Sequence, residues 1–287
     1  RVLIDFSSLE IVTVKRDFPA VYQYLADNVK PERDANRDKW IREHWWKNIR
    51  PRFEWRDARK GLERYISTCM TAKFRTFQAF DNATLPDQAL VVFAFQDWSQ
   101  LAIMSSAVHV SWALAAGGWL GVGNDPRYNN TKCFDTFPFP TLTDLQKTHL
   151  RQLGEDLDAH RKRQQAAQPK LTLTQMYNVL EKLRAGDVIE GKDREMYDQG
   201  LIGILRDLHD QIDAAVADAY GWPVDLSDEE ILLRLVALNK ERAEEEARGQ
   251  IRWLRPDYQT PTGAQAASGK TTDMDLGMVA KIEKAPW

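Results

Sequence analysis

The sequence predicts an α+β protein, with a mixed α/β part over residues 1–140 and an all-α part after it. Up to residue 140, short β-branched and aromatic runs alternate with helical spacings of apolar residues. After that point only long helical spacings remain. The 287 residues are 43% hydrophobic and 28% charged, which is typical of a globular protein and excludes a disordered chain, a collagen and a disulfide scaffold.

The elements of the first part follow from local patterns. Pro31 ends an amphipathic helix over residues 18–29, because the residue before a proline avoids helical geometry. A second helix is expected over residues 35–48. Strands are expected at residues 2–6, 11–14, 64–67, 74–79 and 89–95. The last of these is nearly all apolar, which indicates a central strand.

A buried helix is then predicted from Asp97 to the pair Gly117-Gly118. Asp97 is its expected N-cap with Gln100 as the reciprocal partner, and a glycine is a common helix stop. Residues 119–140 have no helical period and contain the turn signals Asn-Asp-Pro and Asn-Asn. They predict a strand, a tight loop and another strand that closes at Pro138 and Pro140.

The second part is a series of helices. Ser227 and Glu230 form a capping box at the start of the last one. The expected helices cover residues 142–165, 173–183, 195–220 and 227–248, and residues 256–277 have the composition of a linker or tail. We therefore expect three regions, at residues 1–140, 141–255 and 256–287. The sequence starts at Arg1 without a methionine, so we expect a fragment of a longer protein.

The sequence lacks the motifs of catalysis. It has no phosphate-binding glycine loop, nucleophile elbow, adenosylmethionine loop or Asn-Pro-Pro-Tyr motif, and its histidines never pair at metal-ligand spacing. We therefore predict no catalytic residue and no metal site in this chain, and we interpret His109 as a core residue. Cys69 and Cys133 are 64 positions apart and belong to no Cys-x-x-Cys or Cys/His motif. We interpret them as ordinary thiols, which favours a reducing, cytoplasmic location. No apolar run reaches the length of a membrane span.

A basic segment lies at residues 30–60, with 11 basic and six acidic side chains and thus a net charge of +5, whereas the whole chain carries −3. Aromatic residues are interleaved with these charges: Trp40, Trp45, Trp46, Phe53 and Trp55. Arginine and lysine on such a face would neutralise DNA phosphates without reading the base sequence. The alternative is a solvated helix face whose tryptophans pack inward.

The segment Asp-Pro-Arg-Tyr-Asn-Asn at residues 125–130 is followed by Cys-Phe-Asp-Thr-Phe-Pro-Phe-Pro at residues 133–140. This combination resembles the end of the target recognition domain in MmeI-like single-chain restriction–modification enzymes. There an Arg-Tyr-Ser-Asn turn precedes a Tyr/Phe-Asn-Thr-Phe-Pro-Phe-Pro strand. Asn129 stands where the family has serine, and Pro126 precedes the arginine. Weaker likenesses extend over residues 1–256.

The resemblance implies a module that selects a DNA sequence for a DNA (adenine-N6) methyltransferase. The catalytic domain, with its S-adenosylmethionine and in many relatives an endonuclease, would lie in a missing N-terminal part. The family's reading positions correspond to Gly123, Asp125 and Arg127. Arginine suits guanine and aspartate suits cytosine, whereas glycine has no side chain to read with. The adjacent donors implied are Asn129, Asn130 and Lys132. Alternatively, Arg127 forms a structural salt bridge with Asp125.

Phosphate contacts are expected from residues of the basic segment and from three basic residues after it. The set is Arg33, Arg37, Arg42, Lys47 and Arg50, followed by Arg64, Lys73 and Arg75. The helices after residue 141 would act as a spacer or as dimer contacts. The expected partners are double-stranded DNA and the methyltransferase domain of the same polypeptide, with no membrane. The alternative function is a helical protein–protein interaction scaffold without DNA binding, in which residues 142–248 carry the activity.

Overall fold

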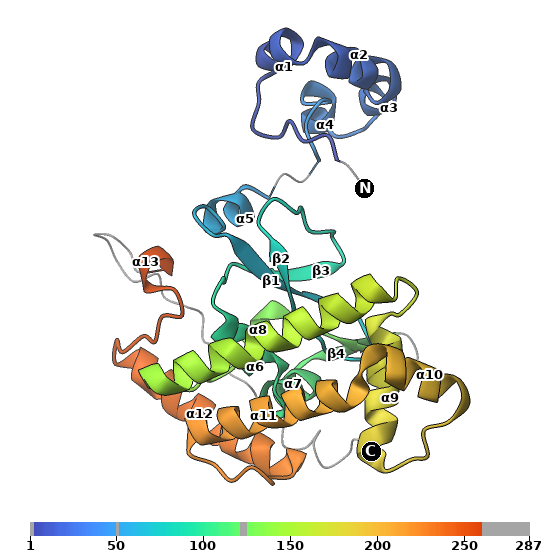
Figure 1. Cartoon of the computed structure of the whole chain (residues 1–287). Coiled ribbons are helices and arrows are strands. Elements are labelled where there is room, and N and C mark those ends of the chain that lie inside the picture. The colour runs from blue at the N-terminus through green and yellow to red at the C-terminus, as the bar shows by residue number, and fades with distance from the viewer. Residues whose placement is uncertain (1–2, 50–51, 121–124, 260–287) are drawn as a thin grey trace. The chain divides into compact units, whose positions relative to one another are not determined.

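The computed structural model describes residues 3–49, 52–120 and 125–259, and it confirms the α+β class. The chain forms two compact units, residues 1–60 and residues 61–287 (Figure 1). None of the helices in the described ranges combines the length and the apolar composition that a membrane span requires.

The first unit consists of short helices around a small core. The helices are α1 (Ile11–Asp17), α2 (Pro19–Asn28), α3 (Lys30–Asp34), α4 (Lys39–Glu43) and α5 (Phe53–Ala58). The core contains Phe6, Val14, Leu25, Trp45 and Trp46. The helix expected over residues 18–29 is confirmed.

Three predictions in this unit differ from the structure. The expected strand at residues 11–14 is helix α1, because Ile11 and Val14 are three residues apart and a helix places both toward the core. The helix expected over residues 35–48 is confined to α4, because Trp45 and Trp46 are consecutive and one helical face cannot bury both. The strand expected at residues 2–6 is also absent from the described residues, which are irregular there.

The second unit contains a three-stranded antiparallel sheet. The strands are β1 (Arg64–Cys69), β2 (Gln78–Asp81) and β3 (Leu90–Phe93), in the order β2-β1-β3. Arg64 is opposite Asp81 on one side of β1, and Cys69 is opposite Leu90 on the other. The expected central strand at residues 89–95 is therefore an edge strand, and β1 is central. The apolar run at residues 89–95 is explained by Phe93 and Phe95, which are buried in the hydrophobic core of this unit.

The buried helix predicted from Asp97 is two helices, α6 (Trp98–Ser105) and α7 (Ala107–Ala116). Asp97 caps α6 by accepting a hydrogen bond from the amide of Ser99 at 3.0 Å. The break occurs at Ser106, whose backbone is extended and whose hydroxyl caps α7. A short antiparallel hairpin follows, made of β4 (Gly118–Leu120) and β5 (Asp125–Arg127).

The second strand expected in residues 119–140 is confirmed only as β5. The chain continues into a π-helical turn, Asn130–Phe134, and then into an irregular stretch. The ring of Phe139 packs on the rings of Phe134 and Phe137, with centroids 5.5 and 4.9 Å apart. Because all three rings point into one aromatic cluster and the prolines lack amide donors, this stretch cannot pair as a strand.

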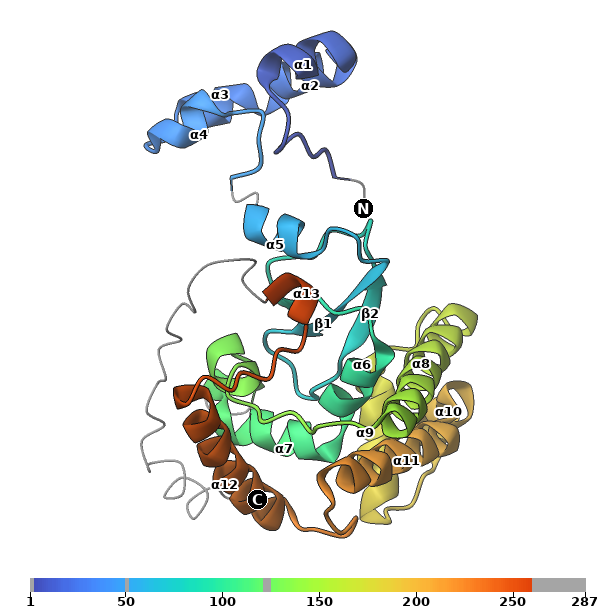
Figure 2. The ribbon, with the colours of Figure 1, turned by 90° about the vertical axis from the view of Figure 1, so that its left-hand side faces the viewer.

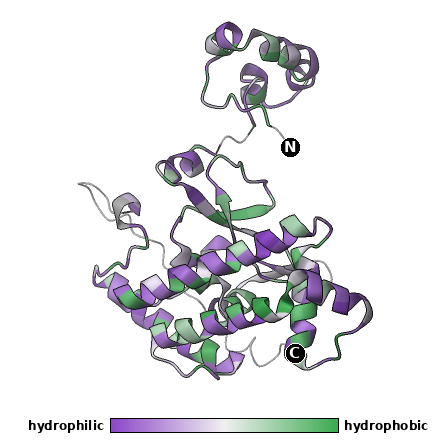
Figure 3. Cartoon of the chain, in the orientation of Figure 1, coloured by the Kyte–Doolittle hydropathy of each residue, from purple (hydrophilic) through white to green (hydrophobic). Residues whose placement is uncertain are grey.

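The remaining helices are α8 (Asp144–Ala167), α9 (Leu173–Ala185), α10 (Gly191–Gly200), α11 (Ile202–Tyr220), α12 (Asp228–Ala247) and α13 (Pro256–Gln259). The capping box of Ser227 and Glu230 is confirmed. The helix expected over residues 195–220 is broken at Leu201, which has a left-handed backbone with φ of 45°. These helices alternate hydrophilic and hydrophobic positions along their length (Figure 3).

Helices α8, α11 and α12 share one hydrophobic core with the sheet and with α6 and α7. Helix α8 packs against α6 and α11, and α12 packs against α7 (Figure 2). Residues on both sides of the expected boundary at 140/141, such as Trp112 and Leu157, are fully buried in this core. The division into regions at residues 140 and 255 stays a prediction.

Polar side chains of α8 complete the free edge of β2. Asp158 accepts a hydrogen bond from the amide of Ala79 at 3.1 Å, and Lys162 donates to the carbonyl of Ala79 at 2.6 Å. Arg161, which is 1% exposed, donates to the carbonyl of Phe77 at 2.8 Å. The helix therefore satisfies backbone groups that a further strand would otherwise bind.

Candidate nucleic-acid interface

Strand β5 presents alternate residues to solvent. Asp125 and Arg127 are exposed, whereas Pro126 and Tyr128 are buried. This is the period of two that an extended backbone dictates. Asn129 and Asn130 follow on the surface as the chain enters the π-helical turn. The alternation separates residues that face outward from residues that hold the strand in place.

Tyr128 is the main anchor of this segment. Its side chain is 1% exposed, and its hydroxyl is hydrogen-bonded to Nε2 of His109 over 3.0 Å. Its ring meets Phe77 and Phe93 edge-on, at centroid distances of 5.7 and 5.9 Å. Burial, aided by the charge of Arg75, lowers the pKa of His109 to about 3, so the imidazole is neutral at pH 7. His109 is thus a core residue, as expected.

The backbone of β5 is held on both sides. The amide of Tyr128 donates to the carbonyl of Met70 at 2.8 Å, and Ala72 donates to the carbonyl of Pro126. On the other side lies Gly117, where an added Cβ would stand 2.7 Å from the carbonyl oxygen of Arg127. Only glycine leaves room for this approach.

The five side chains predicted to read bases are all exposed: Asp125, Arg127, Asn129, Asn130 and Lys132. In the described part of the chain, Asp125 and Arg127 form no ion pair, so the alternative structural salt bridge is not formed. The guanidinium of Arg127 lies 3.5 Å from the sulfur of Met70, its sole side-chain hydrogen-bond partner among the described residues. The carboxamide oxygen of Asn129 caps the following turn by accepting from the amide of Thr131 at 3.0 Å. Gly123 lies outside the described residues.

Lys132 and Asn130 extend the exposed polar surface along the turn that follows β5. In the described ranges their side chains have no hydrogen-bond or ion-pair partner. Both are therefore available to a ligand. Two apolar neighbours, Trp119 and Leu120 on β4, are also exposed at 55% and 41%. Neither residue was among the predicted site residues, although an aromatic and an aliphatic residue beside a glycine-rich turn are a usable signal.

The predicted phosphate contacts in the first unit differ in availability. Lys47 is paired with Glu10 at 2.8 Å, and its side chain is only 11% exposed. Arg42 donates to the carbonyls of Asn36 and Arg37, which ties down the loop between α3 and α4. Arg37 itself is exposed, and its side chain makes no hydrogen bond or ion pair among the described residues.

Two further members of this set complete the first unit. Nη1 of Arg33 is buried without a hydrogen-bond partner in the described ranges. Arg50 lies outside the described residues. Trp45 and Trp46 pack inward, as the alternative to an exposed aromatic face expected, whereas Trp40 is 37% exposed and stacks on His44 at 4.7 Å.

The predicted phosphate contacts in the second unit also differ in how available their side chains are. Arg64 lies over the ring of Trp98 at 4.8 Å and donates to the carbonyl of Gln96. Lys73 is half-exposed and paired with Glu181 at 3.0 Å. Arg75 is 7% exposed, and its guanidinium donates to oxygen atoms of the protein. This burial gives Arg75 a structural environment that does not favour the predicted phosphate contact.

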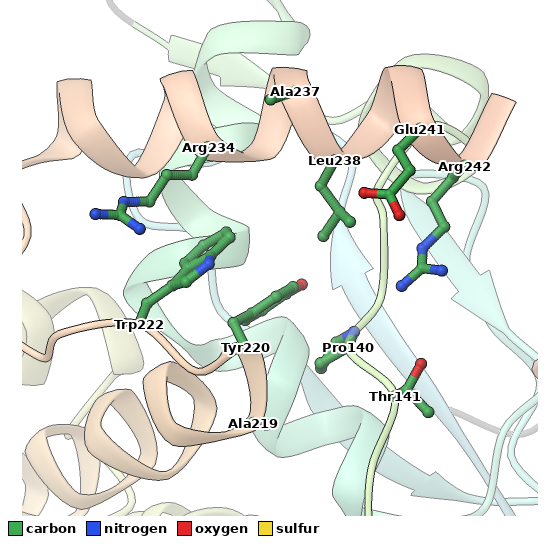
Figure 4. Close-up of a pocket in the computed structure, with 10 residues that line it drawn as sticks. All are labelled: Pro140, Thr141, Ala219, Tyr220, Trp222, Arg234, Ala237, Leu238, Glu241 and Arg242. Atoms are coloured by element: carbon green, nitrogen blue, oxygen red, sulfur yellow. The ribbon is translucent and has the colours of Figure 1, made fainter. Parts of the chain in front are cut away.

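A cavity of about 420 Å³ lies away from this interface, at the end of α11 beneath α12 (Figure 4). Tyr220 and Trp222 stack there with ring centroids 4.3 Å apart, and the guanidinium of Arg234 lies over the ring of Trp222. None of the residues predicted to contact DNA lines this cavity. The part of the chain that the structure describes contains no group of acidic, histidine or cysteine side chains arranged to hold a metal ion.

Two comparisons with known proteins find a similarity to MmeI. The family model described as "MmeI, target recognition domain" matches residues 16–141. A search of curated proteins finds no match. The solved structure of the type IIL restriction–modification enzyme MmeI in complex with DNA has a similar fold, with a TM-score of 0.58 and 16% sequence identity. That match covers 84% of this chain and 28% of the MmeI chain, so the present sequence spans little more than a quarter of that enzyme.

Proposed function

We propose, from the premise that residues 16–141 are an MmeI-like target recognition domain, that this chain reads the base sequence of double-stranded DNA. It would do so for a DNA (adenine-N6) modification methyltransferase or restriction–modification enzyme. The observation that carries the proposal is the alternation along β5, which exposes Asp125 and Arg127 while Pro126 and Tyr128 fix the backbone.

The exposed side chains suit the edges of base pairs. An arginine donates two hydrogen bonds to O6 and N7 of guanine, and an aspartate accepts one from N4 of cytosine. Arg127 and Asp125 are two residues apart on one face of a strand, about 7 Å along the backbone, which corresponds to two base-pair steps of about 3.4 Å each. A two-stranded ribbon such as β4–β5 fits the major groove. Asn129, Asn130 and Lys132 add donors at its edge.

Basic residues away from the hairpin would hold the duplex through its phosphates. Arg37 in the first unit is exposed, and its side chain forms no hydrogen bond or ion pair in the described residues. Lys73 and Arg64 in the second unit are partly exposed and each has an acidic neighbour that competes with a phosphate. Such contacts set register and affinity, whereas base contacts set the sequence. Lys47 and Arg42 would contribute less, because protein groups already occupy them.

The catalytic step would belong to another part of the same polypeptide. A methyltransferase has to rotate its target adenine out of the stack, so the flanking duplex must be held by a separate module. S-adenosylmethionine, which supplies the methyl group, would bind in that catalytic domain, and no residue of this chain is assigned to it. The helices after residue 141 would fix the reading strand relative to that domain.

The test is binding of the chain to a pool of DNA duplexes with a randomised centre, followed by sequencing of the bound fraction. We expect enrichment of a defined sequence and an affinity that falls steeply between about 50 and 200 mM salt. A chain that binds no DNA at low salt would contradict the proposal and favour the helical protein-interaction scaffold. Binding without enrichment would leave phosphate contacts but remove the reading role.

A further inference from the structure

We infer that Arg75 positions the reading strand: its buried guanidinium joins the end of β1 to the backbone of β5, and so sets where Arg127 and Asp125 meet the bases. The inference rests on the proposed function. It assigns to Arg75 a role different from the phosphate contact expected from the sequence.

The hydrogen bonds of Arg75 reach two segments at once. One Nη atom donates to the hydroxyl of Thr68 at 3.2 Å and to the carbonyl of Cys69, both at the end of β1. The other donates to the carbonyl of Pro126 at 3.0 Å, in the middle of β5. A guanidinium has five N–H donors in a fixed plane, so it can hold both segments in one geometry.

Burial makes this arrangement demanding. Arg75 is 7% exposed, and no carboxylate among the described residues pairs with it. A buried cation is costly unless its donors are all satisfied. The ring of Tyr128 supplies further stabilisation, since the guanidinium carbon lies 5.2 Å from its centroid. A neutral side chain would fill this space at lower cost, but it would not connect β1 to β5.

The bonded atoms lie next to the reading residues. Pro126 stands between Asp125 and Arg127, so a shift of its carbonyl moves both neighbours. The opposite side of β5 is closed by Gly117. The strand is therefore held between a glycine on one side and Arg75 on the other. A displacement of 1 Å is enough to break a bidentate contact with a base, because such hydrogen bonds tolerate only a few tenths of an ångström.

The experiment compares Arg75→Gln and Arg75→Lys in this whole chain, using the duplex pool described above. Circular dichroism first establishes that the variants are folded. For Arg75→Gln we expect the preference at the affected base pairs to fall by roughly 5- to 150-fold, the range of one lost base contact, with an unchanged slope of log affinity against log salt. Arg75→Lys keeps one or two of the bonds and should be intermediate.

Lys162→Gln is the control. Lys162 also donates to a backbone carbonyl in this unit, that of Ala79, but among the described residues it has no bond to β5, and no DNA contact is assigned to it. It should leave the base preference unchanged. If Arg75→Gln instead lowers the salt slope by about 0.9 at constant preference, Arg75 contacts a phosphate and the inference is wrong.

Two further outcomes would overturn the inference about Arg75. Unchanged preference and unchanged slope in a folded Arg75→Gln chain would overturn the inference. So would loss of folding in both variants, because Arg75 would then support the whole unit and not the reading strand. If only the glutamine variant fails to fold, the lysine variant carries the same comparison. Failure of the proposed function is separate, since it is visible when the unsubstituted chain enriches no sequence.

Discussion

The hydroxyl of Tyr128 lies 3.0 Å from Nε2 of His109, and both side chains are almost completely buried. The pair connects the end of β5 to the buried helix α7, 19 residues earlier in the chain. The outward residues of β5 are thus attached to the core through their inward neighbour. The following predictions test this arrangement and the function proposed for it.

Substitution of Arg127 by alanine should relax the choice of DNA sequence at one base pair. A bidentate contact with guanine discriminates by about 1–3 kcal/mol, so the preference there should fall by that amount. The measurement is selection from the randomised duplexes, and Asp125→Ala should act at a different position. Thr174→Ala on the exposed face of α9 is the control. An unchanged selected sequence in the Arg127 variant would remove this residue from the reading set.

Arg37→Ala should weaken binding to all DNA sequences alike. Its side chain is exposed and makes no hydrogen bond or ion pair in the described part of the chain, so it is available to a phosphate. Each lost phosphate contact lowers the slope of log affinity against log salt by about 0.9. Fluorescence anisotropy over a salt series measures it. A change in base preference with a constant slope would contradict this role.

Tyr128→Phe should destabilise the second unit by about 1–3 kcal/mol, because Nε2 of His109 loses its partner in the core. The ring contacts with Phe77 and Phe93 remain, so no cavity contributes to the loss. Urea denaturation measures the free energy of unfolding. Tyr24→Phe, at a tyrosine that is 56% exposed, should change it by less than about 0.5 kcal/mol. Equal effects of the two substitutions would contradict the anchoring role.

Acidification should lower the stability of the chain through His109. Burial depresses its pKa from 6.5 to about 3, so the unfolded state binds a proton first as the pH falls. The stabilising contribution is complete above pH 6.5 and is lost between pH 6.5 and 3, at about 1.4 kcal/mol per pH unit. Burial also lowers the pKa of His160 and His209, which adds loss in the same direction.

The control for this effect is His109→Gln, which removes one titrating group from the core. The free energy of unfolding, measured by urea denaturation from pH 7 to pH 4, should depend less steeply on pH in this variant. Its stability at pH 7 will fall as well, but that offset does not affect the slope. An identical slope in both proteins would show that His109 titrates normally in the folded chain.

Asp158→Ala should expose the edge of β2 to exchange. Asp158 is 2% exposed and accepts from the amide of Ala79, so its removal leaves that amide unsatisfied at a cost of about 1–3 kcal/mol. Hydrogen–deuterium exchange at Ala79 is the direct readout. Asp156→Ala is the control. Asp156 lies on the same helix, and its carboxylate accepts a hydrogen bond from Gln152 on the surface. Comparable exchange in the two variants would contradict this role of Asp158.

The sequence predicted those parts of the fold that local chemistry determines. The cap at Asp97, the capping box at Ser227 and the helix over residues 173–183 each depend on residues within one turn, and all three are present. The burial of His109 was also expected and is complete. Local patterns failed where packing decides, as at residues 11–14, whose β-branched side chains lie in a helix.

The polar face of α8 could not be interpreted from the sequence. Its sequence is typical of a solvated helix. Asp158 and Arg161 are nevertheless buried, because they bond the backbone of Ala79 and Phe77, about 80 residues away. The role of Arg75 was missed for the same reason, since its acceptor at Pro126 is 51 residues distant. By contrast, the resemblance in the short segment 125–140 singled out side chains that are exposed in the structure, and their role in base reading stays a prediction.

The alternation along β5 has a consequence for substitutions in this segment. Side chains at Asp125 and Arg127 can be replaced with little effect on folding, since both are exposed to solvent. Their neighbours Pro126 and Tyr128 are constrained by packing instead. Under the proposed function, a single substitution at either exposed position would change the target and leave the scaffold intact.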